Sequence, residues 1–309
     1  MVKQPPVSEV EVKKTPKRKS GVSRKPSTKK TAQGKKTATG KSKEKPSSKK
    51  KSGEPRKLSD MEHYLLMALG ALVFVSAFYF FFIRPYSYRW KPCYGMKAYG
   101  VCVPYGYDVH GIDVSHHQGI INWTELKNVQ FAHFPIRFVF MKATEGGDFK
   151  DKAFDDNFRE AGEHRFIRGA YHFYNPNTDP VKQADFYIKN VELRAGDLPP
   201  VLDIEKKPKD VDKLKGDLKI WLNRIERHYK VKPILYTSYK FKNKYLNDSV
   251  FNTYPYWIAH YYVDSVRYEG QWRFWQHTDV GTLPGIKKQV DLNVFNGTMT
   301  ELMEMTIKE

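Results

Sequence analysis

The chain has 309 residues, of which 40% are hydrophobic and 15% aromatic, so it holds ample apolar material for a folded core. Its formal net charge of +19 is uneven, because residues 1–57 contain 20 Lys and Arg against 4 Asp and Glu, or +16, which leaves +3 for the rest. Two cysteines without a CxxC motif exclude a thiolate framework for zinc or an iron–sulfur cluster.

Residues 1–60 are predicted to form a disordered, Lys-rich cytoplasmic tail. They consist mainly of Lys, Ser, Thr, Pro and Gly and contain no aromatic residue, so they cannot bury enough apolar surface to offset the entropy of ordering. Binding of nucleic acid or acidic lipid through counterion release is an alternative interpretation of this charge. The lack of aromatic residues for base stacking argues against it and favours a solvated tail that fixes membrane orientation.

Residues 61–84 are predicted to form a transmembrane helix. The twenty residues from Tyr64 to Ile83 carry no charge. As a helix, such a run spans about 30 Å, which matches a bilayer core. The run is longer than a typical signal-peptide core and ends in bulky aromatic residues, so we expect an uncleaved anchor. Five basic residues between positions 49 and 57 precede it, which predicts a cytoplasmic N-terminus and a periplasmic or extracellular remainder.

Residues 85–106 are predicted to be a juxtamembrane connector rich in Tyr, Pro and Gly. Both cysteines, Cys93 and Cys102, lie in it. Because the predicted topology places them in an oxidising compartment, we expect a disulfide that closes a small loop. Two free thiols are the alternative.

Residues 107–309 alternate short apolar segments with helical ones, the pattern of an α/β fold. Helices are expected over 151–165, 179–191 and 211–229, and strands over 111–115, 138–144, 169–174, 201–205, 233–238, 256–261, 272–277 and 290–295. Five β/α units followed by three strands give eight strands, the number that closes a small barrel. We therefore predict a TIM-like (β/α)5(β)3 barrel with its reacting groups at the C-terminal strand ends.

A pair of carboxylates is the strongest chemical signal in this domain. In the segment Val201–Glu205, strand alternation places Asp203 and Glu205 on one face with Cα atoms about 6.5 to 7 Å apart. Adjacent acids disfavour double ionisation, and the one in drier surroundings has a raised pKa that suits a general acid. Helix capping or cation binding is the alternative. Asp113 and Asp291, on the first and last strands, would bring four carboxylates to one mouth.

Further polar and aromatic residues are expected around the same mouth as substrate contacts: Tyr171, His172, Tyr236, Trp257 and Gln276. Aromatic faces with a few well-placed polar groups commonly hold carbohydrate rings, although core packing is the alternative for each aromatic residue. The adjacent pair His116-His117 diverges on an extended chain and no HExxH motif is present, so we expect no metal. No P-loop, GxGxxG or GxSxG motif is present, and we expect no cofactor.

Six segments taken together resemble glycoside hydrolase family 25, the Chalaropsis-type lysozymes: Gly111–Gly119, Lys142–Gly146, Gly169–Phe173, Leu202–Glu205, Trp257–Tyr261 and Val290–Asn293. The resemblance covers about residues 107–297. It implies a flattened (β/α)5(β)3 barrel that cleaves the β-1,4 bond between N-acetylmuramic acid and N-acetylglucosamine in peptidoglycan. It also implies that Glu205 is the general acid and that Asp203, Asp113 and Asp291 line the cleft.

The favoured interpretation is therefore a membrane-anchored lysozyme-type glycosidase that faces the cell wall. A non-catalytic peptidoglycan- or glycan-binding module on the same fold is the alternative. The presence of all four acids argues against it, because a module that only binds needs no paired acid and carboxylate.

Overall fold

The computed structural model describes residues 57–84, 87, 93, 95–267 and 270–308. The predicted disorder of the tail concerns residues that lie, up to position 56, outside this set. The chain separates into two compact units, residues 1–63 and 64–309, each of which is described by itself.

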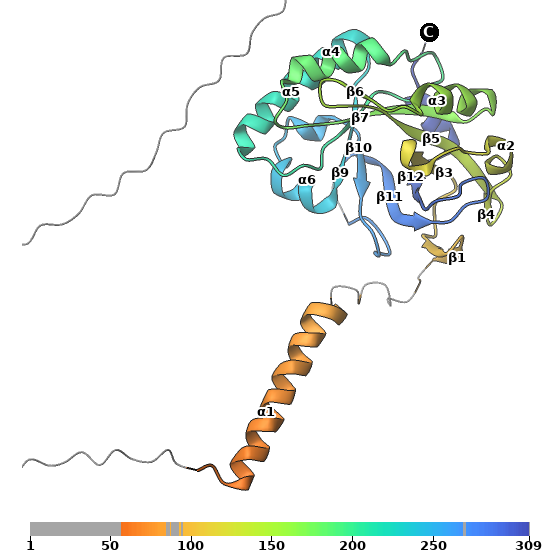
Figure 1. The fold of residues 1–309 in the computed structure, drawn as a ribbon. Coiled ribbons are helices and arrows are strands. Elements are labelled where there is room, and N and C mark those ends of the chain that lie inside the picture. The colour runs from red at the N-terminus through yellow and green to blue at the C-terminus, as the bar shows by residue number, and fades with distance from the viewer. Residues whose placement is uncertain (1–56, 85–86, 88–92, 94, 268–269, 309) are drawn as a thin grey trace, which may run out of the picture. The chain divides into compact units, whose positions relative to one another are not determined.

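Helix α1 (Asp60–Phe78) continues into the π-helical segment Tyr79–Ile83 (Figure 1). A reciprocal cap starts it, because the Ser59 N–H donates to Glu62 Oε2 (2.7 Å) and the Glu62 N–H donates to Ser59 Oγ (3.3 Å). Asp60–Ile83 is long and apolar enough to cross a membrane, and none of its residues is buried within the protein. By length and composition it suits a membrane anchor or a signal sequence.

Eight strands of the second unit close into a barrel, as predicted: β3 (His110–Val114), β5 (Phe134–Glu145), β7 (Ile167–Phe173), β8 (Val201–Asp203), β9 (Ile234–Ser238), β10 (Tyr256–Ala259), β11 (Trp272–Gly281) and β12 (Val290–Phe295). Their order is β3-β12-β11-β10-β9-β8-β7-β5, and the pairing of β3 with β5 closes the ring. Strand β12 is antiparallel to both of its neighbours, whereas the other pairs in the ring are parallel. Two short strands, β4 (Gln130–Phe131) and β6 (Phe149–Lys150), pair with β5.

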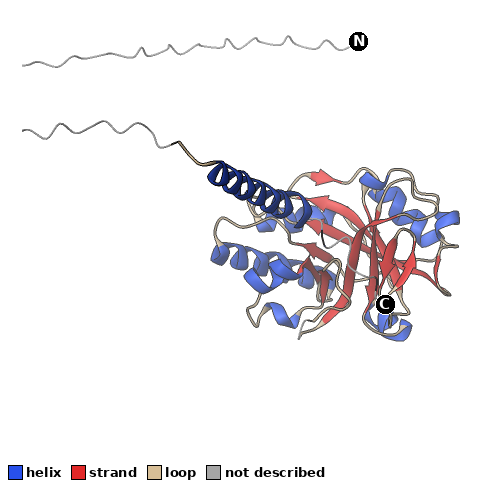
Figure 2. Ribbon diagram, turned by 90° about the horizontal axis from the view of Figure 1, so that it is seen from below, coloured by secondary structure: helices blue, strands red, loops and turns tan. Residues whose placement is uncertain are grey.

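A helix follows each of the first five barrel strands: α2 (Trp123–Leu126), α3 (Phe154–Glu163), α4 (Pro180–Asn190), α5 (Val211–Tyr229) and α6 (Tyr239–Tyr245). Figure 2 shows the strands at the centre of the domain and the helices around them. The described residues between β10 and β12 contain no helix, and α7 (Met299–Met305) ends the domain. Helices α3, α4 and α5 lie where the sequence predicts them. Asp179 and Asp210 start α4 and α5 by accepting backbone N–H groups.

Residues alternate along the strands between an outer and an inner apolar layer. On β10, Trp257 and Ala259 belong to the inner cluster, whereas Tyr256 and Ile258 belong to the outer one. Aromatic rings fill the barrel interior. Gly111 and Gly169 make room for them, since a Cβ on either glycine would lie 2.3 Å from a ring, that of Phe138 or Phe140 respectively. Each glycine precedes an inward polar residue, Asp113 or Tyr171, by two positions, so the rings pack directly below the polar end of the barrel.

The connector contains a hairpin of β1 (Met96–Ala98) and β2 (Val101–Val103), and the predicted Cys93–Cys102 disulfide is confirmed, with a Cα–Cα distance of 5.5 Å. Val103 is buried in the outer core cluster. The Tyr99 hydroxyl donates to the Gln130 carbonyl (2.9 Å), and the Tyr99 carbonyl accepts the Thr282 N–H (3.0 Å). This hairpin therefore packs on the barrel and is part of its fold.

Candidate active site

Four carboxylates lie at one end of the barrel. Asp113 is on β3 and Asp203 is the last residue of β8, both near the C-terminal ends of parallel strands. Asp291 is near the start of the antiparallel strand β12, directly across from Asp113. Glu205 follows β8 by two residues. The set expected from the sequence is thus gathered where barrel enzymes carry their chemistry.

Glu205 does not lie on a strand, which corrects the prediction that the strand spans 201–205. Strand β8 ends at Asp203, and one further backbone bond, from the Ile204 N–H to the Tyr236 carbonyl (2.9 Å), ties the chain to β9 before it turns away. Asp203 is 6% exposed, whereas Glu205 is exposed. Glu205 can therefore reach a ligand in the mouth while Asp203 lies beneath it.

Both members of this pair have raised pKa values. Burial and the charge of Glu205 hold the pKa of Asp203 well above its usual range, and Asp203 Oδ1 is buried without a hydrogen-bond partner among the described residues. Although part of Glu205 reaches solvent, burial against the barrel wall raises its pKa as well, opposed by the Tyr236 hydroxyl and Lys142. Glu205, to which the resemblance assigns the role of general acid, is thus a carboxyl with a raised pKa beside a more deeply buried acid.

Asp113 is held as a hydrogen-bond acceptor. Its Oδ2 accepts from Gln276 Nε2 (2.8 Å) and from Asn293 Nδ2 (2.7 Å). Burial raises its pKa to about 6, the two amide donors oppose that rise, and the charge of Glu205 adds to it. Hydrogen bonds to its charged form thus offset part of the cost of burial.

Aromatic side chains set the orientation of both amides. Gln276 Oε1 accepts the hydroxyl groups of Tyr236 (2.7 Å) and Tyr261 (2.5 Å), which leaves its NH₂ group for Asp113. Asn293 Oδ1 accepts the indole N–H of Trp257 (2.8 Å), a group that can only donate. The barrel wall thus aims two N–H donors at one carboxylate. Sequence analysis missed Asn293, although alternation along the last strand places it on the same face as Asp291.

Trp257 and Tyr171 line the wall beneath the acids. The Trp257 side chain is 2% exposed and stacks on Phe140 with ring centroids 4.3 Å apart, so its ring belongs to the core and its N–H belongs to the polar network. Tyr171 is half-buried and meets Trp257 edge to face at 6.4 Å. Burial and the charges of four acids, Asp113, Asp203, Asp291 and Asp151, hold the pKa of Tyr171 well above its usual range, so its hydroxyl stays protonated beside them.

His172 is not part of this site, which corrects its assignment as a substrate contact. It follows Tyr171 on β7 and therefore points to the opposite face, toward the helices. It is fully buried, with Nδ1 2.7 Å from Thr144 Oγ1 and Nε2 3.2 Å from Gln183 Oε1. Its ring stacks on Trp221, and burial lowers its pKa to about 4. His172 is thus a neutral packing residue between barrel and helices.

Within the described residues, no group of three or more His, Cys, Asp or Glu side chains could hold a metal ion. His116 instead bonds to the buried Asp151, whose Oδ2 lies 2.6 Å from His116 Nδ1 and also accepts the His116 backbone N–H at 3.1 Å. This contact fixes the turn that follows β3.

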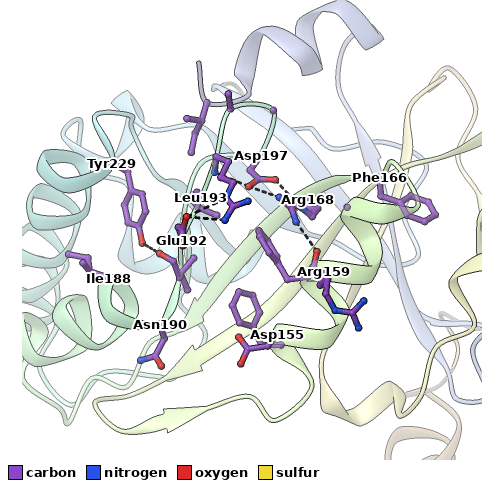
Figure 3. A pocket seen from close by; sticks show the side chains of 18 of the residues that line it. Asp155, Arg159, Phe166, Arg168, Ile188, Asn190, Glu192, Leu193, Asp197 and Tyr229 are labelled. Atoms are coloured by element: carbon purple, nitrogen blue, oxygen red, sulfur yellow. Dashed lines mark hydrogen bonds and ion pairs between the residues drawn. The ribbon is translucent and has the colours of Figure 1, made fainter. Parts of the chain in front are cut away.

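A pocket of about 1260 Å³ lies at the other end of the barrel, along α3 and the C-terminal ends of α4 and α5 (Figure 3). In it Arg168, at the start of β7, makes a two-pronged ion pair with Asp197, with Nε–Oδ1 and Nη2–Oδ2 distances of 2.8 and 3.1 Å. Arg168 also donates to the Phe158 carbonyl (3.0 Å). These polar groups satisfy one another, and the four carboxylates are at the opposite strand ends.

Comparison with known proteins identifies the family. Residues 112–286 match the family Glycosyl hydrolases family 25. The protein YegX of Escherichia coli O6:H1 is 37% identical over 253 residues, which is 77% of this chain and 91% of that protein. Lysozyme M1 of Streptomyces globisporus is 33% identical over 213 residues, which is 64% of this chain and 71% of that protein.

A solved structure supports the same assignment. The family 25 glycosyl hydrolase of Bacillus anthracis superposes with a TM-score of 0.59 at 33% identity, over 65% of this chain and 94% of that one. These matches confirm the resemblance read from the six sequence segments. The chain belongs to glycosyl hydrolase family 25.

Proposed function

We propose that this protein is a peptidoglycan hydrolase, a muramidase that cleaves the β-1,4 bond between N-acetylmuramic acid and N-acetylglucosamine. The observation that carries the proposal is the pair Asp203 and Glu205, which differ in exposure and both have raised pKa values at the polar end of a closed barrel. A carboxylic acid that holds its proton near neutral pH is what protonation of a glycosidic oxygen requires. Relatives named as lysozymes support the choice of substrate.

In this proposal Glu205 is the general acid, because it is the exposed member of the pair and can reach the leaving oxygen. The buried carboxylates then face the cleaved sugar. Because that sugar carries an N-acetyl group, we favour substrate assistance, in which the acetamide oxygen attacks the anomeric carbon and Asp203 or Asp291 orients the acetamide. Asp113, held by two amide donors, would stabilise the positive charge that develops on the ring.

Mass spectrometry of the products tests this activity. Full-length protein in mild detergent, incubated with purified peptidoglycan, should release muropeptides that end in a reducing N-acetylmuramic acid. Glu205→Gln should release none, whereas Asp264→Asn, which changes an exposed carboxylate beside Arg267, should match the unaltered protein. Reducing ends on N-acetylglucosamine would contradict the proposal, and retention of glycan strands without cleavage would favour the non-catalytic binding module.

We further propose that residues 61–84 anchor the barrel to the cytoplasmic membrane as a single span, with the Lys-rich tail in the cytoplasm and the barrel periplasmic or extracellular. The apolar helix Asp60–Ile83 supports the span, and the Cys93–Cys102 disulfide supports an oxidising compartment. Protease added outside an intact cytoplasmic membrane should degrade the barrel. Complete protection would contradict this topology, and retardation of DNA by the isolated tail at physiological salt would favour a nucleic-acid role for it.

A further inference from the structure

Two lysines and one glutamate form a charged group on the rim of the active-site mouth. Lys142 Nζ lies 2.7 Å from Glu145 Oε2, and Lys206 Nζ lies 3.0 Å from Glu145 Oε1. Both ammonium groups also lie over the Phe173 ring, at 4.7 and 4.8 Å from its centroid. The carboxylate and the ring face therefore hold the two cations side by side.

This group belongs to the site described above. Phe173 pairs with Asp203 across β7 and β8, and Lys142 pairs with Tyr171 across β5 and β7, so these side chains share the inner face of the barrel. Lys206 directly follows Glu205 in the chain. The positive charge of Lys142 lowers the pKa values of both Asp203 and Glu205, against the rise that burial causes.

The group carries more positive than negative charge. Its two lysines lower the pKa of Glu145, which is therefore ionised near neutral pH and balances one of them. The Lys142 side chain is 11% exposed, whereas that of Lys206 is 40% exposed, so the ammonium that solvent or a ligand can reach is that of Lys206. Lys207 and Lys209 are exposed on the same loop, which makes this side of the mouth a basic rim.

We propose that Lys206 is a specificity-determining residue that binds a carboxylate of the substrate strand. This inference rests on the proposed muramidase function. N-acetylmuramic acid differs from N-acetylglucosamine by an O-lactyl group that ends in a carboxylate or continues into a peptide stem bearing its own carboxylates. An ammonium held in place by Glu145 and Phe173 loses less side-chain entropy when it binds such a group than a free lysine would. Lys206 thereby distinguishes wall strands from neutral chitin-type oligosaccharides.

Three substrates separate the sources of the carboxylate: a neutral chitooligosaccharide, peptide-free glycan strands with lactyl carboxylates, and peptide-bearing strands. Lys206→Met keeps the aliphatic stem and removes the charge. It should lower kcat/KM on the anionic strands by about 3- to 10-fold, the scale of a partly exposed charge contact, and change it less than about twofold on the neutral substrate. A loss on peptide-free strands assigns the contact to the lactyl group, and a loss confined to peptide-bearing strands assigns it to the stem. Lys206→Arg should retain most of the anionic preference.

Lys207→Met is the matched control, because it removes one charge from the same loop without the contacts to Glu145 and Phe173. Equal losses from Lys206→Met and Lys207→Met would mean a diffuse charge effect and overturn the proposal. Equal losses of kcat/KM for Lys206→Met on neutral and anionic substrates would overturn it too, since they would mean that the substitution disturbs the acid pair Asp203 and Glu205. Equilibrium binding of peptide-free strands to Glu205→Gln, with and without Lys206→Met, tests the contact without turnover. Absence of cleavage with a Lys206-dependent affinity would refute the muramidase activity and leave the carboxylate site standing.

Discussion

Asp113 and Asp291 stand directly opposite each other in the antiparallel pair of β3 and β12, so their side chains share the inner face of the barrel. Like charges at such a position repel. Burial, and then the charge of Asp113, raise the pKa of Asp291 to about 9, while amide donors limit the rise of Asp113 to about 6. Two chemically identical groups thereby differ in proton affinity, with Asp291 protonated and Asp113 able to ionise near neutral pH.

This difference predicts how stability varies with pH. A carboxyl whose pKa is raised on folding binds more protons folded than unfolded, so its contribution to stability declines as pH rises from about 4 to about 9. Asp291→Asn removes that decline. At pH 8 the variant should have a free energy of unfolding at least about 1 kcal/mol above that of the unaltered protein, and near pH 4 the two should be alike. This lower bound is smaller than the free energy that corresponds to a shift of one pKa unit. Thermal unfolding across this range measures it, with the exposed Asp264→Asn as control. Parallel curves would contradict the assignment.

The donors on Asp113 should be visible in the pH dependence of the rate. Asn293→Ala removes a hydrogen bond that the side-chain amide donates to Asp113 and that favours the ionised carboxylate, so the pKa of Asp113 should rise. If ionised Asp113 stabilises the transition state, the acidic limb of the kcat/KM profile should move to higher pH. The control is Asn296→Ala, because Asn296 directly follows β12 and its side-chain amide donates to the Trp272 carbonyl rather than to Asp113. A uniform loss of rate with an unmoved limb would assign Asn293 a packing role alone.

Asp203 should show opposite effects on stability and activity. Its buried carboxyl has a strongly raised pKa, and one of its oxygens has no hydrogen-bond partner among the described residues. Its ionisation therefore costs more folding free energy as the pH rises above the usual pKa of an aspartate. Asp203→Asn should therefore raise the melting temperature at pH 8. It should also lower kcat by at least about 10²-fold, the usual scale for removing a group that acts in proton transfer or in orienting the reacting atoms. A variant with reduced stability and near-normal activity would remove Asp203 from the catalytic set.

The barrel and its acids could be predicted from the sequence because they depend on local signals. Apolar runs at regular spacing gave the eight strands, and capping residues such as Asp179 and Asp210 mark where helices begin. The apolar alternation of Val201–Glu205 continues past the strand itself, so the strand was predicted too long. Its end is set by its pairing with β9, which the local sequence does not contain.

The errors and omissions at the site have a similar origin. Tyr171 and His172 are neighbours, and strand alternation allows one of them to face the mouth, but which one depends on the ring packing inside the barrel. The amide network joins residues on β3, β11 and β12, and the Lys206–Glu145 contact joins positions 61 residues apart. Such long-range pairs leave no periodic trace in a single sequence.

The Cys93–Cys102 disulfide should affect local stability without affecting catalysis. It closes a loop across a sequence separation of 9, which in the chain-entropy picture stabilises the folded hairpin by about 2 to 3 kcal/mol. The double Ser variant should therefore expose β1 and β2 to proteolysis at lower temperature. Its kcat should be unchanged, because the hairpin packs on the outer layer of the barrel. Free labelling of both thiols without reductant would contradict the disulfide, and a large loss of kcat would tie the hairpin to the site.

The stereochemical course of the reaction tests the choice of substrate assistance. The acetamide oxygen attacks the face of the anomeric carbon opposite the leaving group, and water then attacks the face that the leaving group has left, so two inversions give net retention. A β-linked glycan strand or chitooligosaccharide should therefore yield the β-anomer first, with the α-anomer appearing later through mutarotation. An NMR time course of the anomeric protons measures this directly. Appearance of the α-anomer as the first product would exclude both assisted and covalent retention, and would require Asp203 or Asp291 to activate a water molecule on the opposite face of the sugar ring.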